Sequence, residues 1–148
     1  MKIRATNPSD LDQLSHLFDG YRVFYRKTSD VEAAKKFISE RLNNKDSEIY
    51  VCEMEDGLLS GFVQLYPLFS STRMKRLWLL NDLYVNTEFR GEGISLLLID
   101  RAKELVRDSG ACGMFLETEK SNMIGNRLYP KAGFELNDGA NYYVWDSE

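Results

Sequence analysis

The chain has 148 residues, the size of one domain, and 43% of them are hydrophobic and 12% aromatic. This apolar content is enough for a core, which excludes a wholly disordered chain. The net charge of −4 argues against nucleic-acid binding by phosphate neutralisation, because such proteins are normally basic. No apolar run is long enough to span a bilayer and no signal peptide follows Met1, so we expect a cytoplasmic protein that contacts neither nucleic acid nor membrane.

The two cysteines, Cys52 and Cys112, each lie in an apolar stretch and do not form a C-x-x-C pair. One disulfide between them is arithmetically possible. We favour two reduced thiols in the core, which is typical of proteins of the cytoplasm.

The first half of the chain predicts a strand, two helices and a hairpin. Lys2–Thr6 has the pattern of a short edge strand. Apolar residues then recur at three- and four-residue spacing over Leu11–Tyr25, which predicts an amphipathic helix, and a second helix is expected after Asp30. Glu48–Met54 and Leu58–Leu68 are two expected strands joined by a tight turn.

The second half predicts alternating strands and helices. The expected elements, in order, are a central strand Leu77–Val85, a helix Ile94–Asp108, a short strand Gly113–Thr118, a helix Asn122–Lys131, and a closing strand pair Phe134–Leu136 and Tyr142–Trp145. The full order is β-α-α-β-β-β-α-β-α-β-β. It predicts an α/β fold with a mixed sheet flanked by helices, antiparallel at first and with a right-handed crossover in the middle.

A glycine-bearing loop, Arg90–Gly93, joins the central strand to the helix that follows it. Free N–H groups and the positive end of the dipole make a helix start suitable for an anion, and glycine lets a phosphate approach the backbone. The loop lacks the nucleotide-triphosphate pattern, and Leu96 stands where the dinucleotide pattern needs its third glycine. Because Arg90 and Glu92 cancel in charge, backbone N–H groups would hold the anion. The alternative is an ordinary strand-to-helix turn.

A second segment, Asn122–Phe134, places Tyr129 four residues before Gly133. Together the two segments resemble the Gcn5-related N-acetyltransferase (GNAT) superfamily, with its motifs [QR]-x-x-G-x-[GA] and N-x-x-A-x-x-x-Y-x-x-x-G-F. The resemblance covers essentially the whole chain, residues 1–148, as a single domain. Ser95 and Gly125 depart from the two motifs, although both residues are small.

The run Trp78–Val85 is similar to the polyamine, histone-type and diamine branch of the superfamily. Asn81 departs from that branch, because diamine acetyltransferases tend to carry a carboxylate at this position. Asp82 stands beside it. This departure weakens the specific polyamine interpretation.

The resemblance implies acetyl-CoA as co-substrate and no metal. The pyrophosphate would lie on the helix start and the pantetheine arm along the central strand, where a backbone N–H near Leu83 would polarise the acetyl carbonyl. The residues expected to bind acetyl-CoA are Leu83, Tyr84, Val85, Arg90, Gly91, Glu92, Gly93, Ile94, Ser95, Leu96, Asn122 and Asn126.

The resemblance also implies direct attack of an amine on the thioester, so neither Cys52 nor Cys112 needs a nucleophilic role. Tyr129 matches the family acid that protonates the leaving thiolate; the alternative is a packing role for its ring. Asp82 is our candidate base, because an alkyl amine is mostly protonated at pH 7. Strict alternation along the strand places Asp82 on the same face as Leu80 and Tyr84. Asp82 therefore reaches the acceptor only if the acceptor binds on that face, or if a β-bulge turns the Asp82 side chain toward the other face.

A structural hydrogen bond is the alternative role for Asp82, and Glu117 and Glu119 are weaker candidates for the base. Tyr21, Tyr25 and Asn81 are expected to shape the acceptor site, although core packing explains the tyrosines about as well.

The sequence therefore predicts an N-acetyltransferase that acts on a primary amine of a small molecule. A protein or peptide acetyltransferase and a non-catalytic acyl-CoA-binding module remain as alternatives. Members of the resembling branch often form homodimers, and the apolar Tyr142–Trp145 could contribute an edge to one.

Overall fold

The structure, a computed structural model, describes residues 1–148 as two compact units, Met1–Glu117 and Thr118–Glu148. The strands are β1 (Lys2–Ala5), β2 (Glu48–Glu53), β3 (Leu59–Ser70), β4 (Lys75–Val85) and β5 (Met114–Phe115). The α-helices are α1 (Leu11–Phe24), α2 (Val31–Asn44), α3 (Ile94–Asp108) and α4 (Met123–Lys131), and the short 3-10 helices are η1 (Pro8–Asp10) and η2 (Thr87–Phe89).

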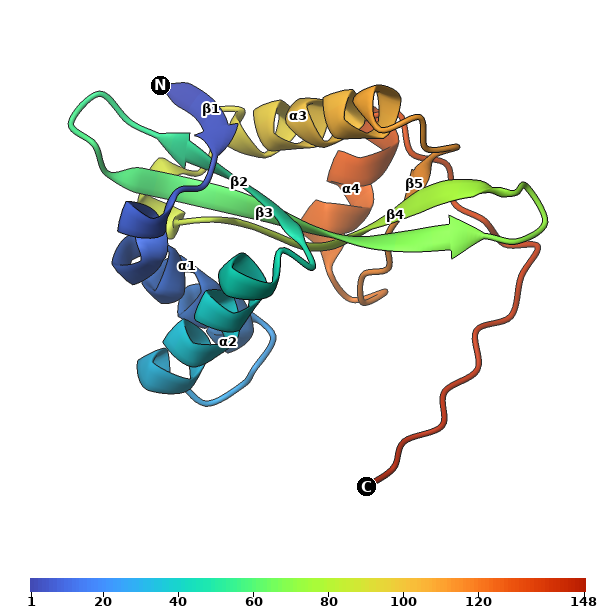
Figure 1. Ribbon diagram of the computed structural model, residues 1–148, viewed down its shortest axis with the longest axis horizontal. Helices are drawn as coiled ribbons and strands as arrows, with labels where there is room; N and C mark the ends of the chain where they lie inside the picture. Colours follow the sequence, from blue (N-terminus) through green and yellow to red (C-terminus); the bar gives the residue numbers. More distant parts are fainter. The chain divides into compact units, whose positions relative to one another are not determined.

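The five strands form one sheet in the order β1-β2-β3-β4-β5 (Figure 1). The pairs β1–β2, β2–β3 and β3–β4 are antiparallel, and β5 is parallel to β4. The predicted mixed sheet with an edge strand at the N-terminus is thus confirmed. The α3 helix, which makes the crossover from β4 to β5, has the predicted bounds.

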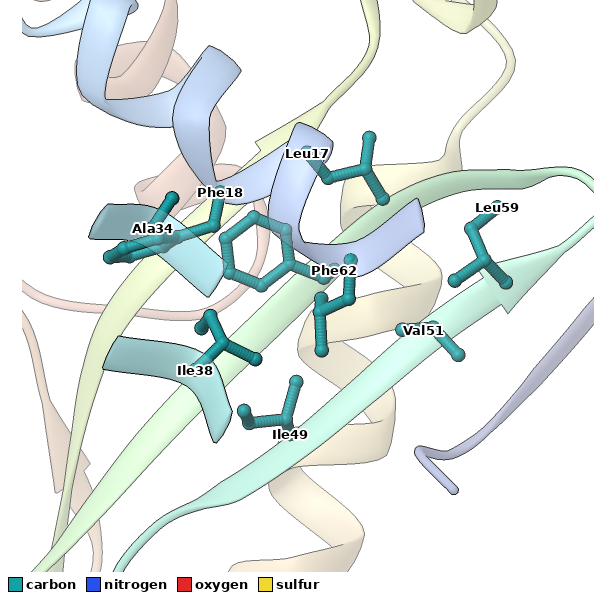
Figure 2. Packing of buried hydrophobic residues seen from close by; sticks show 9 residues of the cluster. Leu17, Phe18, Ala34, Ile38, Ile49, Val51, Leu59 and Phe62 are labelled. Atoms are coloured by element: carbon teal, nitrogen blue, oxygen red, sulfur yellow. The ribbon is translucent and has the colours of Figure 1, made fainter. Parts of the chain in front are cut away.

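Helices cover both faces of the sheet. Side chains of α1 and α2 pack against β2 and β3 in one buried cluster, in which Phe18 and Phe62 meet edge to face at 6.3 Å (Figure 2). Phe62 has no exposed surface, and burying a side chain of this size stabilises the fold by about 1.5–3 kcal/mol. On the other face, the Arg101 guanidinium of α3 lies 4.2 Å from the ring centroid of Tyr50 in β2.

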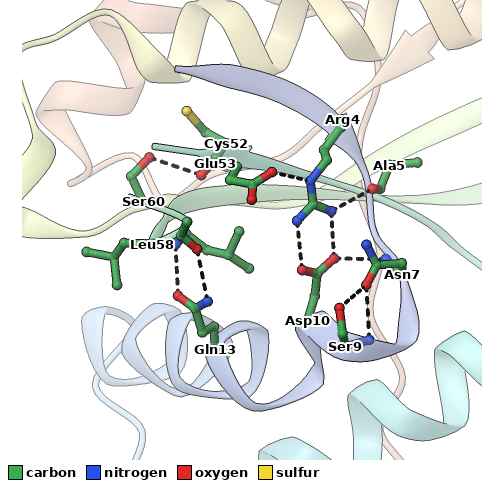
Figure 3. A network of polar contacts seen from close by, with 12 residues as sticks. Arg4, Ala5, Asn7, Ser9, Asp10, Gln13, Cys52, Glu53, Leu58 and Ser60 are labelled. Atoms are coloured by element: carbon green, nitrogen blue, oxygen red, sulfur yellow. Dashed lines mark hydrogen bonds and ion pairs between the residues drawn. The ribbon is translucent and has the colours of Figure 1, made fainter. Parts of the chain in front are cut away.

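A partly buried ion pair joins β1 to the segment that leads into α1. Arg4 donates two hydrogen bonds of 2.8 Å to the Asp10 carboxylate and one of 2.6 Å to Glu53 in β2 (Figure 3). Asp10 also accepts the backbone N–H of Asn7 at 2.8 Å, and although it directly precedes α1, its side chain makes no capping bond to that helix. The Arg4 guanidinium holds the pKa of Asp10 below its usual range.

This pairing predicts a pH-dependent loss of stability in Asp10→Asn. Because the folded-state pKa of Asp10 is lowered, its contribution is full above the ordinary carboxyl pKa of 3.8 and is lost as the pH falls through the folded value. We expect the variant to lose roughly 1–3 kcal/mol relative to the wild type at pH 7 and a smaller amount near pH ~3, because the wild type begins to lose the contribution of Asp10 below pH 3.8. Thermal melts at both pH values measure this, with Asp12→Asn, in an exposed pair with Lys35, as a control that should change little.

The predicted closing strand pair is wrong: no strand forms after Lys131. A two-stranded hairpin is marginal unless its apolar side chains pack on something. Here the apolar side chains are exposed, including Leu136 at 90% and Trp145 at 87%. The strand expected at Gly113–Thr118 is also shorter than predicted and covers only Met114–Phe115.

Neither cysteine is in a disulfide; Cys52 is buried and Cys112 is half-buried. No helix has the length and apolar character needed to cross a membrane.

Candidate active site

The central strand β4 leaves one of its edges open. Its pairing with β5 covers only Trp78 and Leu79, whereas its pairing with β3 continues to Val85. From Leu80 onward, β4 therefore has a strand neighbour on one side only. An extended ligand with amide groups can bind along such an edge as an added strand does.

A β-bulge interrupts β4 beside this open edge. Gln64 of β3 pairs with Asp82 and the next residue, Leu65, pairs with Leu80, so Asn81 is the extra residue. Paired residues share a face, so the bulge separates Leu80 from Asp82, which the strict alternation had placed together. Asp82 now shares the face of Gln64 and Tyr84, and hence of Phe62, which packs on α1 and α2.

The Asp82 carboxylate is 2% exposed and is held by several donors. Gln64 Nε2 donates to Oδ2, and Asn81 Nδ2 donates to Oδ1 at 2.9 Å. Ser47 Oγ donates to Gln64 Oε1 at 2.8 Å, so the network runs from β4 through β3 to the residue that precedes β2. Tyr21 of α1 makes a further hydrogen bond to Asp82 and donates to the carbonyl oxygen of Asn81 at 3.2 Å.

Burial raises the pKa of Asp82, although the hydrogen bonds from Gln64, Asn81 and Tyr21 act in the opposite direction. A carboxylate with a raised pKa is a stronger base, as a proton acceptor at neutral pH requires. Burial, and then the charge of Asp82, also raises the pKa of Tyr66, whose hydroxyl therefore stays protonated.

The two predicted acceptor-site tyrosines lie together at the end of α1. The ring centroids of Tyr21 and Tyr25 are 5.1 Å apart in an edge-to-face arrangement, and Tyr21 also meets Phe62 at 6.2 Å. Asp19 fixes the loop that follows α1, because it accepts hydrogen bonds of 2.7 Å from the Ser29 hydroxyl and the Asp30 backbone N–H. The structure thus brings Tyr21, Tyr25 and the bulge to one side of β4.

The backbone of the predicted phosphate loop has positive φ angles at its two glycines. Gly91 and Gly93 have φ angles of 86° and 78°, a region that favours glycine, and a β-carbon on either would meet no atom within 4 Å. Gly93 caps α3 without a side-chain hydrogen bond, and Leu97 N–H makes the first bond of the helix, to Gly93 at 3.2 Å. The N–H groups of Ile94, Ser95 and Leu96 therefore have no partner in the helix, which fits the pyrophosphate of acetyl-CoA.

Arg90 is held at the entry to this loop. Its Nε donates to the carbonyl oxygen of Val85 at 3.2 Å, and its guanidinium lies 5.7 Å from the ring centroids of both Phe24 and Tyr84. The arrangement fixes a positive charge where β4 ends. Glu92 is exposed.

Substitutions at the two glycines that flank α3 should affect acetyl-CoA affinity differently while they affect fold stability equally. In Gly93→Ala, a methyl group enters the space that a phosphate would use, so we expect at least a ~10-fold loss of acetyl-CoA affinity, measured by calorimetry. Gly110→Ala, at the other end of α3, is the matched control: its φ is 69° and its β-carbon also meets nothing within 4 Å. Both variants should lose stability by roughly 1–2 kcal/mol, and equal affinities in the two would contradict the placement of the phosphate.

The second unit contains the other predicted residues. Asn122 caps α4: its Oδ1 accepts the Gly125 N–H at 3.1 Å, and its Nδ2 donates to Thr118 Oγ1 at 2.9 Å. Asn126 Nδ2 donates to the carbonyl oxygen of Asn122 at 2.8 Å. Gly125 is required by this cap, because a β-carbon there would lie 2.5 Å from Asn122 Nδ2.

Tyr129 is half-buried in the same unit, and its ring lies edge to face with Phe134 at 5.8 Å. The backbone N–H of Phe134 donates to the carbonyl oxygen of Tyr129 at 3.0 Å, which turns the chain back after α4. The fixed spacing between the tyrosine and the Gly-Phe pair therefore has a structural reason. Glu119 also belongs to this unit, and its carbonyl oxygen accepts a 3.0 Å bond from Asn126.

Two residues of the site, Gln64 and Ser47, were missed by the sequence analysis. Gln64 is fully buried within a run of apolar residues in β3. A buried amide is costly unless it is hydrogen-bonded, so a polar residue at an apolar strand position was the signal that could have identified it.

Comparison with known proteins agrees with this geometry. Residues 11–134 match the model of the acetyltransferase (GNAT) family. An uncharacterised N-acetyltransferase of Bacillus subtilis is 41% identical over 97% of this chain and 95% of its own length. The crystal structure of a probable acetyltransferase superposes with a TM-score of 0.94 at 36% identity, covering 100% of this chain and 99% of that one.

A ribosomal-protein-alanine N-acetyltransferase from Brucella melitensis has the same fold, with a TM-score of 0.81 at 20% identity over 99% of this chain and 100% of its own. Members of the family use acetyl-CoA, and the open edge of β4 and the loop at Gly91 and Gly93 suit that ligand. The chain therefore belongs to the GNAT family and is an acetyltransferase.

Proposed function

We propose that the whole chain, residues 1–148, acts as one domain that transfers the acetyl group of acetyl-CoA to a primary amine of a small molecule. The observation that carries this proposal is the position of the buried Asp82 carboxylate in the bulge of β4, beside an open strand edge that leads to the glycine loop. Acetyl-CoA would supply a thioester that an amine attacks directly. The two cysteines in free form are consistent with a place in the cytoplasm.

In this proposal, separate groups of residues bind acetyl-CoA and transfer the protons. The N–H groups at the start of α3 bind the pyrophosphate, and the open edge of β4 over Leu83–Val85 binds the pantetheine amides. Asp82 takes the proton from the amine, directly or through water, and Gln64 positions its carboxylate. Tyr129 donates its hydroxyl proton to the leaving sulfur, and Asn122 and Asn126 complete the binding of the arm.

Two features support a small amine as the acceptor. The aromatic rings of Tyr21 and Tyr25 lie beside the bulge, and aromatic faces attract cations. A streptothricin acetyltransferase of Escherichia coli, whose name gives a small molecule, is 27% identical over 89% of this chain and 80% of its own length. The run Trp78–Val85 suggests the polyamine and diamine branch, but Asn81 stands where that branch tends to carry a carboxylate. A second copy of the chain, as a homodimer, is the proposed assembly.

A panel of acceptors tests the proposal. Release of CoA thiol from acetyl-CoA is measured with polyamines, aminoglycosides, amino acids and peptides. A small amine should give the highest kcat/KM. If peptides are acetylated faster than every small amine, the acceptor class is a protein, as it is for the ribosomal-protein-alanine enzyme named above. Binding of acetyl-CoA without turnover on any acceptor would contradict the proposed transfer.

A further inference from the structure

The carboxylate of Asp82, the proposed base, has very little surface on which an amine could bind. The residue is 2% exposed, and both of its oxygens accept hydrogen bonds, Oδ2 from Gln64 and Oδ1 from Asn81. This arrangement leaves almost no room for direct contact between the carboxylate and an acceptor. A base in this position needs a group that carries the proton from the amine to the carboxylate.

Three side chains form hydrogen bonds with the Asp82 carboxylate, and they differ in their ability to transfer protons. Gln64 and Asn81 are carboxamides, whose nitrogens donate hydrogen bonds but do not take up a proton near neutral pH. The third partner, the hydroxyl of Tyr21, is both a donor and an acceptor, so it can receive one proton while it gives up another. Tyr66 also lies near Asp82, but the two interact by charge rather than by a hydrogen bond.

The ring of Tyr21 is held in place, while its hydroxyl has two neighbouring acceptors. The ring centroid lies 6.1 Å from that of Phe18 and 6.2 Å from that of Phe62, two rings of the buried cluster in Figure 2, and 5.1 Å from that of Tyr25. The hydroxyl donates to the carbonyl oxygen of Asn81 at 3.2 Å and also bonds to the carboxylate. Rotation about the C–O bond can therefore move the hydrogen between the two while the ring stays fixed. Unlike the carboxylate, Tyr21 is partly exposed.

We propose that the Tyr21 hydroxyl carries a proton from the acceptor amine to Asp82. In one concerted step, the ammonium form of the acceptor gives a proton to the Tyr21 oxygen, and the hydroxyl gives its own proton to an oxygen of Asp82. One N–H bond breaks and one carboxyl O–H bond forms, so the tyrosine stays neutral and the nitrogen keeps the electron pair that attacks the thioester. After the product leaves, the reverse transfer to water restores the carboxylate. This relay rests on the proposed function, because it needs Asp82 to be the base.

A double-mutant cycle tests the relay. Tyr21→Phe keeps the ring and its aromatic contacts but removes the hydroxyl, so kcat/KM should fall at least roughly tenfold at pH 7. Two groups that act in the same proton transfer are not additive, so adding Tyr21→Phe to Asp82→Asn should cause no further loss. If the hydroxyl only holds the bulge through the carbonyl of Asn81, Tyr21→Phe should cause the same fold-loss in both backgrounds. The cycle therefore distinguishes a relay from a structural role.

Tyr50→Phe is the matched control, because it removes a hydroxyl from a buried ring in β2 that has no role in the reaction, and its rate should stay normal. Calorimetry should give every variant the wild-type affinity for acetyl-CoA, and circular dichroism melts check that the variants fold. A normal kcat/KM in Tyr21→Phe, or an equal loss in both backgrounds, would overturn the relay. If Asp82→Asn is slow in that case, the base role stands without the relay. A normal rate in Asp82→Asn would remove the base and the relay together.

Discussion

Asp82→Asn should lower kcat/KM by roughly 10²–10⁴-fold at pH 7, the usual contribution of one positioned base. The fold should survive, because the Gln64 amide can turn over: its oxygen then accepts from the new amide, and its nitrogen donates to the Ser47 hydroxyl. In the wild type, kcat/KM should rise with pH as Asp82 loses its proton. Burial raises that pKa above the ordinary value of 3.8, and the variant should lack this limb.

The pH dependence of kcat/KM distinguishes a role of Asp82 as the base from a purely structural role of its carboxylate. An alkyl amine has a pKa near ~10.4, so its free form increases steadily toward high pH. If Asp82 removes the proton from the amine, the difference in kcat/KM between the wild type and Asp82→Asn should shrink as the pH rises. If Asp82 has only a structural role, that difference should persist at high pH. Asp46→Asn is the matched control, since both carboxylates act on the pKa of Tyr66 and Asp46 is exposed. A normal rate at pH 7 in Asp82→Asn would exclude the base role.

Most of the sheet and the long helices could be predicted because their patterns are local. The apolar spacing in α3 predicts a helix from Ile94 to Asp108, and these are its bounds. The position of Asp82 could not be predicted in this way. Alternation along β4 assumes one residue per pleat, and the extra residue Asn81 reverses the faces that follow it. Only pairing with β3 reveals the bulge.

The part of the site that sequence reasoning missed depends on contacts between distant segments. Gln64 and Ser47 are 18 and 35 positions before Asp82, and nothing in the spacing connects them. Residues 134–148 show the opposite error. Their apolar residues on either side of Asn137–Gly139 predict a strand pair, but a strand also needs a partner, and the structure has no strand there. Local pattern gives the tendency to pair, and tertiary or quaternary contacts decide whether pairing occurs.

Tyr129→Phe should lower kcat by ~10²–10⁴-fold while acetyl-CoA affinity changes little. The parent thiol of the leaving group has a pKa near ~8.5, so a tyrosine hydroxyl beside the sulfur can assist its departure by giving up a proton. The phenylalanine ring keeps the edge-to-face contact with Phe134 that the structure shows at 5.8 Å. Because a proton donor acts mainly in the transition state, the loss should appear in kcat when chemistry limits the rate.

A packing role for Tyr129 predicts a different result. The rate of Tyr129→Phe would then be near normal, and only Tyr129→Ala, which removes the ring contact with Phe134, would lose stability and activity together. Tyr50→Phe is the control for loss of a hydroxyl from a buried ring, because Tyr50 is 3% exposed in β2 and has no proposed role in the reaction. Single-turnover measurements of all three variants on a good acceptor separate chemistry from product release. A wild-type kcat in Tyr129→Phe under those conditions would show that Tyr129 is not the proton donor. Water would then protonate the departing thiolate.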